Sequence, residues 1–257
     1  MTSLTFLGSG DSQGVPRWWC DCSVCDEARN TGKNARTRPS ALLQGAGERI
    51  LLDAAPELRL QMIRQNLESI DAILITHAHN DHILGLGDVA DRARWTGKGI
   101  PIFAPATVIP HIQERFGYLQ RGSYSELVPM LELESTSRSF AGFNVKAHRV
   151  PHGANGFAYG FRFESEAFTW AYVPDSISLT DLTPWRELDL LILGTSFYKE
   201  NAALEKCSVY DVQEVVALLK KLKPKRTVFT HLGHGVDVRK AAPKGTRYAF
   251  DGLRLEL

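Results

Sequence analysis

The sequence is poor in cysteine and has almost no net charge. Its 257 residues include four cysteines, and 30 Lys and Arg nearly balance 29 Asp and Glu. Three of the cysteines, Cys20, Cys22 and Cys25, fall close together, which excludes a framework of disulfides spread over the chain. A formal charge of +1 creates no global field that would recruit nucleic acid or an anionic membrane.

Long hydrophobic runs are also missing. No apolar stretch approaches the roughly 18 residues that a membrane-spanning helix needs. Residues 1–8 lack a basic region and reach glycine before an apolar core of signal-peptide length develops. We therefore expect a cytoplasmic protein. No repeat or linker marks a boundary, so residues 1–257 are expected to form one domain.

Apolar, β-branched runs alternate with amphipathic segments, a pattern typical of layered α/β proteins. Helices are predicted at 56–66 and 208–221, with Ser208 as the N-cap of the second, and more weakly at 88–96 and 108–116. Residues 117–139 lack periodicity and are expected to form a flexible excursion over a site. The predicted strands are 4–7, 41–44, 49–53, 72–76, 102–104, 131–133, 143–150, 157–163, 168–173, 188–193, 227–230 and 253–257.

The segment that follows predicted strand 72–76 concentrates potential metal ligands. It holds three of the chain's eight histidines and a carboxylate. Imidazoles and carboxylates suit zinc, manganese or iron, and a strand end gives them rigid support. Three further candidates each follow a predicted strand, and strand ends at one sheet edge share a crevice. The first group is His77, His79, Asp81 and His82, and the second is His152, Asp175 and His231.

This His-x-His-x-Asp-His pattern resembles that of the metallo-β-lactamase fold hydrolases, and the resemblance covers nearly the whole chain. It implies an αββα sandwich of two mixed β-sheets flanked by helices. It also implies two divalent metal ions that activate a hydroxide without a serine or cysteine nucleophile. Asp53 matches a family position that supports the site. One ion would take His77, His79 and His152, the other Asp81, His82 and His231, with Asp175 bridging them and with Asp81 and Asp175 as catalytic residues.

The cysteine cluster predicts a second kind of metal site. Cys20, Cys22 and Cys25 supply three thiolates, one fewer than a closed structural zinc requires. His234, three residues after His231, is the candidate for the fourth ligand. Residues 18–39 are therefore predicted to form a structural zinc knuckle, with the neighbouring pair Trp18 and Trp19 packed over it.

The cysteine loop and the segment before it, residues 7–16, look like those of PhnP-type phosphodiesterases, whose relatives include the pyrroloquinoline quinone B proteins. The resemblance implies attack of metal-bound hydroxide on a small or cyclic phosphodiester, such as phosphoribosyl 1,2-cyclic phosphate, with manganese or zinc in the active site. The alternatives are an RNA-processing nuclease, a thioester or lactone hydrolase, and a low-turnover cofactor-pathway protein of the pyrroloquinoline quinone B type. The predicted partner is a small phosphodiester rather than a membrane or nucleic acid, and a homodimer is left open.

The chain departs from the PhnP-type pattern at one position. Those enzymes carry an additional histidine after the strand that corresponds to residues 188–193, whereas no histidine occurs here between Asp175 and His231. Another position that often holds histidine in the family is Cys207. The group that protonates the leaving oxygen is therefore left open, and the candidates are His148, Ser196, Tyr198, Lys199 and Cys207.

Overall fold

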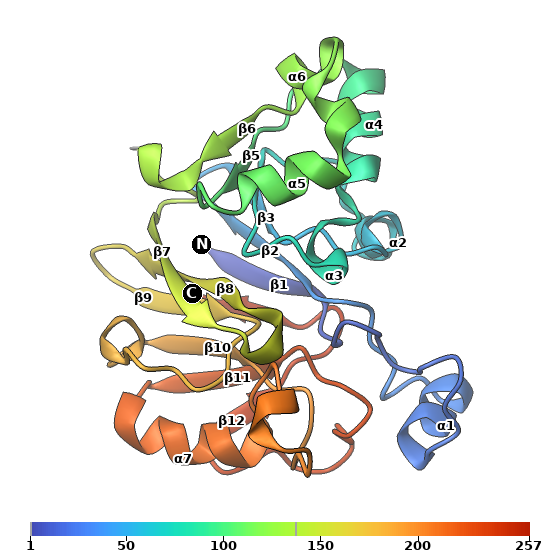
Figure 1. Cartoon of the computed structure of the whole chain (residues 1–257), viewed down its shortest axis with the longest axis vertical. Coiled ribbons are helices and arrows are strands. Elements are labelled where there is room, and N and C mark those ends of the chain that lie inside the picture. The colour runs from blue at the N-terminus through green and yellow to red at the C-terminus, as the bar shows by residue number, and fades with distance from the viewer. Residues whose placement is uncertain (1, 137) are drawn as a thin grey trace.

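Thirteen strands in the computed structural model, which describes residues 2–136 and 138–257, form two mixed sheets. The sheets pack face to face, with helices on their outer sides (Figure 1). This arrangement confirms the predicted αββα sandwich.

The first sheet has the order β13-β1-β2-β3-β4-β5-β6. Strands β1, β2 and β3 run antiparallel, as do β1 and β13, whereas β3 to β6 are parallel. In the register between β3 and β4, Leu52 lies opposite Leu74. The strands are β1 (Ser3–Gly8), β2 (Ser40–Gly45), β3 (Glu48–Leu52), β4 (Ala72–Leu74), β5 (Ile102–Ala104), β6 (Met130–Glu132) and β13 (Arg254–Glu256).

The second sheet has the order β12-β11-β10-β9-β8-β7 and repeats the same plan. An antiparallel part, β7 to β9, leads into parallel pairing from β9 to β12. Parallel strands end at one edge, so the loops after them meet there. The strands are β7 (Asn144–Pro151), β8 (Phe157–Glu164), β9 (Thr169–Val173), β10 (Leu190–Gly194), β11 (Arg226–Thr230) and β12 (Thr246–Tyr248).

The core follows the two-residue period of the strands. On β10, Leu190 and Ile192 pack between the sheets, whereas Leu191 and Leu193 pack on the other side, against the helix that leads into β11. That helix is α7 (Val212–Leu222), whose residues Val212 and Val215 are fully buried.

The remaining helices accompany the first sheet or its loops. Helices α4, α5 and α6 lie at the end of the molecule opposite α7 (Figure 1). The helices are α1 (Ser23–Asn30), α2 (Leu58–Arg64), α3 (Asn80–Ile83), α4 (Leu86–Thr96), α5 (Ile109–Arg115) and α6 (Ser123–Leu127), with 3₁₀ turns η1 (Gly117–Gln120), η2 (Leu133–Ser135), η3 (Gly153–Asn155), η4 (Thr183–Trp185) and η5 (Leu204–Lys206). Among the described residues, no helix has the length and apolar character needed to cross a membrane.

Two predictions about the helices and loops are wrong. The N-cap of α7 is Asp211 rather than Ser208, because Asp211 and Glu214 form a reciprocal capping box. The described part of 117–139 is not an excursion over a site. It contains η1, α6, β6 and η2, with β6 paired to β5, and none of its described residues lines the cavity beside the histidine cluster.

The connection between β1 and β2 carries α1 and projects from the body of the molecule (Figure 1). Asp251 holds the two ends of this projection together. Its carboxylate accepts hydrogen bonds from the backbone N–H groups of Ser9, at 2.9 Å, and Thr37, at 2.8 Å. Only a small apolar cluster lies within the projection itself, comprising Val15, Val24, Cys25 and Ala28.

Candidate metal centres

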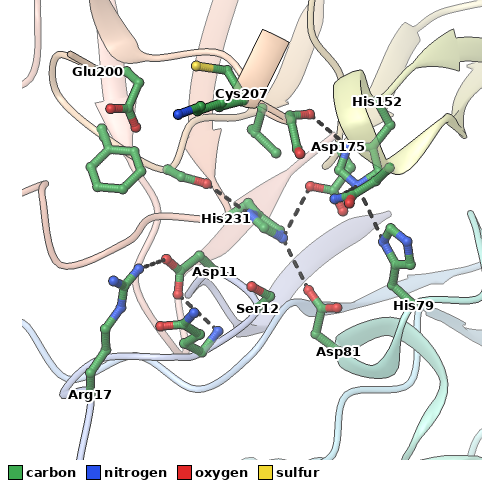
Figure 2. Close-up of a pocket in the computed structure, with 17 residues that line it drawn as sticks. Asp11, Ser12, Arg17, His79, Asp81, His152, Asp175, Glu200, Cys207 and His231 are labelled. Atoms are coloured by element: carbon green, nitrogen blue, oxygen red, sulfur yellow. Dashed lines mark hydrogen bonds and ion pairs between the residues drawn. The ribbon is translucent and has the colours of Figure 1, made fainter. Parts of the chain in front are cut away.

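The seven predicted active-site ligands lie at the ends of four strands. The first four follow β4 of the first sheet, and α3 begins within that loop, at Asn80. The other three follow β7, β9 and β11 of the second sheet. The site therefore joins the edges of both sheets (Figure 2). The structure brings together His77, His79 and His152 in one group, and Asp81, His82, Asp175 and His231 in another.

In the group of three histidines, ring nitrogens approach one another closely. His77 Nε2 is 2.9 Å from His79 Nδ1, and His152 Nε2 is 3.3 Å from the same His79 atom. Bond lengths of about 2.0 Å in a tetrahedral zinc site separate two nitrogen ligands by about 3.3 Å. The spacing of the three nitrogens is thus suited to one divalent ion.

Asp175 lies between the two groups. Its Oδ2 is 3.3 Å from His77 Nε2 and 2.8 Å from His82 Nε2. Its Oδ1 is 3.2 Å from His231 Nε2, and that nitrogen is also 3.3 Å from Asp81 Oδ2. This carboxylate is placed to contact ligands of both groups, which is the position that a bridging ligand needs.

Asp53 positions one of the ligands, His82, through a hydrogen bond. Its carboxylate accepts hydrogen bonds from His82 Nδ1 at 2.8 Å and from the backbone N–H of Thr76 at 2.8 Å. Asp53 has a φ of +58° and His231 one of +55°, a left-handed conformation that Asp, Asn and His adopt more readily than most residues. The carboxylate fixes the ring of His82 so that Nε2 faces Asp175.

Two other histidines are oriented in the same way. His152 Nδ1 donates to the carbonyl oxygen of Ser208 at 2.7 Å, leaving Nε2 toward the cluster. His77 Nδ1 lies 3.0 Å from Thr76 Oγ1, again leaving Nε2 toward the cluster. Outer hydrogen bonds of this kind fix the tautomer of a metal-binding histidine and strengthen it as a ligand.

The charges in the cluster favour a cation. Burial acts to raise the pKa of Asp81, but the neighbouring His82 and His231 outweigh it and hold the pKa well below its usual range. Burial also acts to raise the pKa of Asp175, but His231 and His82 outweigh it and lower that pKa. Burial lowers the pKa of His77 well below its usual range, with His82 adding to that effect. Burial acts to lower the pKa of His82 and of His231, but the neighbouring carboxylates outweigh it and raise both. A divalent ion would take the place of these imidazole protons between the carboxylates.

Two buried polar atoms show that the residues fit metal ions. His82 Nε2 and Asp175 Oδ1 are shielded from solvent, and although each lies close to a charged neighbour, neither makes a well-directed hydrogen bond within the described part of the chain. A buried polar atom without a partner is costly unless something else satisfies it. Both atoms point into the cluster of nitrogen and oxygen donors, and a divalent ion between these donors would satisfy them.

The cysteine cluster forms a separate site. His234 Nδ1 lies 3.3 Å from Cys20 Sγ, 3.5 Å from Cys22 Sγ and 3.5 Å from Cys25 Sγ. Bond lengths of about 2.3 Å to sulfur and about 2.0 Å to nitrogen in tetrahedral zinc give a separation of about 3.5 Å. The backbone N–H of Arg17 also donates to Cys25 Sγ, at 3.4 Å. The four side chains fit a closed zinc site.

The neighbouring tryptophans do not pack over this site as expected. Trp18 is 86% exposed and Trp19 is 55% exposed, with their rings in edge contact at 5.2 Å. The apolar side chains close to the cysteines come from α1 and from Val15 instead.

A polar cavity of about 360 Å³, here called the first cavity, opens over the cluster (Figure 2). Of the candidate proton donors, Ser196 and Cys207 line it. Tyr198 lies at a separate hollow beside α1, and Lys199 is absent from the wall of the first cavity. His148 packs edge-on against Trp185, with ring centres 5.4 Å apart, away from the cluster.

Sequence reasoning missed several residues that line the first cavity, among them Asp11, Arg17, Lys206 and Asn155. Asp11 belongs to a glycine-rich segment whose pattern indicates a turn, and Arg17 lies immediately before the two tryptophans. Lys206 precedes Cys207, a position that often holds histidine in the family, and this departure could have drawn attention to Lys206. Asn155 lies in η3, three residues after His152, and carried no signal of its own.

Three comparisons place the chain among known proteins. Residues 48–232 match the family described as "Beta-lactamase superfamily domain". A solved structure described as a new diphosphatase from the PhnP family is 33% identical, with a TM-score of 0.84 over 100% of this chain and 98% of that one. Zinc-bound PqqB from Methylobacterium extorquens, at 21% identity and a TM-score of 0.79, covers 99% of this chain and 100% of that one and shares the fold.

A curated relative adds a different kind of similarity. The octanoyltransferase of Porphyromonas gingivalis is 28% identical over 256 residues, which cover 96% of this chain and 50% of the relative. This chain therefore spans about half the length of that protein.

Proposed function

The chain belongs to the β-lactamase superfamily and, within it, to the PhnP-like hydrolases, and we propose that it hydrolyses small or cyclic phosphodiesters with two divalent metal ions. The observation that carries this proposal is the position of Asp175 between two sets of ligands, beside a polar cavity. Zinc and manganese both suit imidazole and carboxylate donors.

Two ions bound by these residues would activate a water molecule and stabilise negative charge on the phosphate oxygens. The water oxygen forms a new bond to phosphorus while the bond from phosphorus to the leaving oxygen breaks. The leaving oxygen keeps the electron pair of that bond and takes up a proton. The chain thus needs groups that bind the phosphate, orient the leaving group and donate a proton.

The first cavity supplies such groups. The ammonium group of Lys206, the hydroxyl of Ser196 and the thiol of Cys207 all line it. Burial, with Glu200 next in effect, raises the pKa of Cys207, so this thiol keeps its proton at neutral pH. We assign to this wall the proton that the leaving oxygen requires.

We further propose that the cysteine site, Cys20, Cys22, Cys25 and His234, holds one structural zinc. All four ligand positions are filled by side chains, as in structural rather than catalytic zinc sites. His234 and His231 lie three residues apart, so this zinc would fix the same segment that carries an active-site ligand.

Hydrolysis of an acyl thioester is a second candidate, favoured by the similarity to an octanoyltransferase. The lining of the first cavity argues against it, since Asp11, Arg17, Glu200 and Lys206 leave little apolar wall for an eight-carbon chain. Octanoyl-coenzyme A tests this candidate directly. RNA remains a less favoured substrate because the chain's charge is nearly balanced.

The deciding experiment is hydrolysis of bis(p-nitrophenyl) phosphate. Protein stripped of active-site metal is reconstituted separately with manganese and with zinc, and His79→Ala serves as the inactive control. Turnover that returns with metal and is absent from the variant supports the proposal. Metal binding at full stoichiometry without hydrolysis of this diester would refute it and favour the thioester or a low-turnover role.

A further inference from the structure

A second cavity adjoins the metal centre on the side of α5. It has a volume of about 270 Å³, and its wall includes His77 and His79 of the cluster. The rest of its wall comes from the segment containing α5 and from the start of β8, which follows the His152 loop. The function proposed above uses only the first cavity and leaves this one without a role.

The two cavities share part of one wall. His79 and Asn155 line both of them, so the cavities adjoin at these two residues. His79 Nδ1 is within 3.3 Å of His152 Nε2, which places the shared wall at the group of three histidines. Both cavities therefore reach the group of three histidines, the first through His79 and His152 and the second through His77 and His79.

The wall of the second cavity combines an aromatic ring with charged and polar side chains, and Arg149 packs on that ring from outside the wall. Phe157 forms part of its wall, and the guanidinium of Arg149 lies 3.9 Å from the centre of that ring. His111 and Arg115 reach it from α5, and Glu114 adds one negative charge. Such a wall suits a flat ring that also carries polar or anionic groups.

The first cavity has a different character. Arg17 donates to the carboxylate of Asp11 at 3.0 Å, so a donor and an acceptor lie side by side in its wall (Figure 2). The Nε atom of Arg17 is buried without a partner among the described residues. A paired carboxylate and guanidinium can receive and donate hydrogen bonds at neighbouring hydroxyls of a ligand.

This inference rests on the proposed metal-dependent phosphodiesterase activity and narrows its substrate class. We propose that the natural substrate is not a cyclic diester but an acyclic phosphodiester with two sizeable substituents, one in each cavity. The first cavity takes a hydroxyl-bearing group and the second a flat aromatic group such as a nucleobase with its sugar. A cyclic diester has both ester oxygens in one ring, so it would leave one cavity empty. The two cavities and their contrasting walls thus point to the acyclic class.

The test compares three substrates with the metal-loaded protein. Thymidine 5′-(p-nitrophenyl) phosphate has a large group on each side of phosphorus. Methyl p-nitrophenyl phosphate keeps the same leaving group but has a methyl in place of the nucleoside, and 2′,3′-cyclic AMP is the cyclic reference. We expect kcat/KM for the thymidine ester to exceed that for the methyl ester by about tenfold or more.

Blocking variants then test each cavity separately. Ser12→Trp fills the first cavity and His111→Trp fills the second, both from exposed positions. Gln113→Trp, also on α5 but outside both cavities, is the matched control. Each blocking variant should lower kcat/KM for the thymidine ester by about tenfold, whereas only one of them should lower it for the methyl ester.

Binding gives a readout that does not need turnover. Calorimetry with the thymidine ester and metal-free protein should show binding weakened about fivefold or more by His111→Trp relative to Gln113→Trp. If His111→Trp behaves like Gln113→Trp in both assays, or if 2′,3′-cyclic AMP is the best of the three substrates, the two-cavity inference is wrong. Absence of metal-dependent hydrolysis of any diester would instead refute the proposed function, and the binding assay would still decide this inference.

Discussion

The molecule contains two candidate metal centres whose ligands are positioned by different parts of the structure. In the active-site cluster, each of four strand ends delivers one or more ligands, and His77, His82 and His152 have a second ring nitrogen held by a further group. In the cysteine site, three ligands come from a projection that has a small apolar cluster of its own. We therefore expect the fold to hold the first set of ligands together and the second set to depend more strongly on its ion.

This difference separates what each centre does. Loss of an active-site ligand should remove chemistry while the sheets keep their shape. Loss of a cysteine ligand should remove structure first, since metal binding to such a site is coupled to its folding. Substitutions at matched positions in the two centres therefore test this difference.

The largest effect is expected for Asp175→Asn, which removes the charge between the two groups and keeps the shape of the side chain. Losing several kcal/mol of charge stabilisation lowers the rate about a thousandfold or more. Hydrolysis of bis(p-nitrophenyl) phosphate measures the rate, and thermal unfolding of metal-free protein checks the fold. Turnover within about tenfold of the parent protein would show that Asp175 does not bridge two ions.

A smaller effect of a different kind is expected for Cys25→Ser. We expect one fewer zinc per chain, a stability loss of about 3 kcal/mol and a fall in Tm of about 6–12 °C. Cys207→Ser is the matched control, because this cysteine lies outside the cluster. Metal analysis and thermal unfolding measure the result. Equal shifts for both variants would contradict a structural zinc at this site.

The same contrast explains what could be predicted from the sequence. The ligands of the active-site cluster follow strands with strong apolar patterns, such as Ala72–Leu74, so local signals place them at strand ends. Cys20, Cys22 and Cys25 lie within six residues and indicate a knuckle by their spacing, and His234 is a candidate because it lies three residues after His231. Both sites can be predicted because histidine, aspartate and cysteine are recognisable in the sequence as potential metal ligands.

Features set by long-range packing could not be predicted. Asp11, Lys206 and Asn155 meet at the first cavity from three separate loops, and no local pattern records that meeting. Strand β12 (Thr246–Tyr248) contains no run of apolar residues, and α3 has only four residues, so neither shows a pattern in the sequence. The exposure of Trp18 depends on where the projection lies relative to the body, which residue type alone does not reveal.

A moderate effect is expected for Asp53→Asn. Asparagine tolerates the left-handed conformation of this residue, so the backbone should not be strained. The charged partner of His82 is lost, and metal affinity in the active-site cluster should fall by about 10–100-fold. Titration of metal-free protein with manganese measures the affinity. Zinc at the cysteine site should be unaffected, and equal loss at both sites would show that the centres are not independently supported.

The smallest effect is expected for Tyr172→Phe. Its hydroxyl donates to Asp53 over 3.4 Å, a long contact, so we expect a loss of about 0.5–1 kcal/mol in stability and at most about threefold in metal affinity. Burial, followed by the charge of Asp53, raises the pKa of Tyr172 well above its usual range.

The pH dependence of this last variant follows from the direction of that shift. Because the folded protein binds the phenolic proton more tightly than the unfolded chain, the contribution of Tyr172 is complete below the usual tyrosine pKa of about 10 and is lost as pH rises beyond it. Urea unfolding of metal-free protein at pH 7, 9 and 10.5 measures the difference between parent and variant. The difference in free energy of unfolding should be the same at pH 7 and pH 9. At pH 10.5 the parent protein should lose stability relative to the variant. A Tyr172→Phe effect larger than that of Asp53→Asn would show that the tyrosine, rather than the carboxylate, orients the cluster.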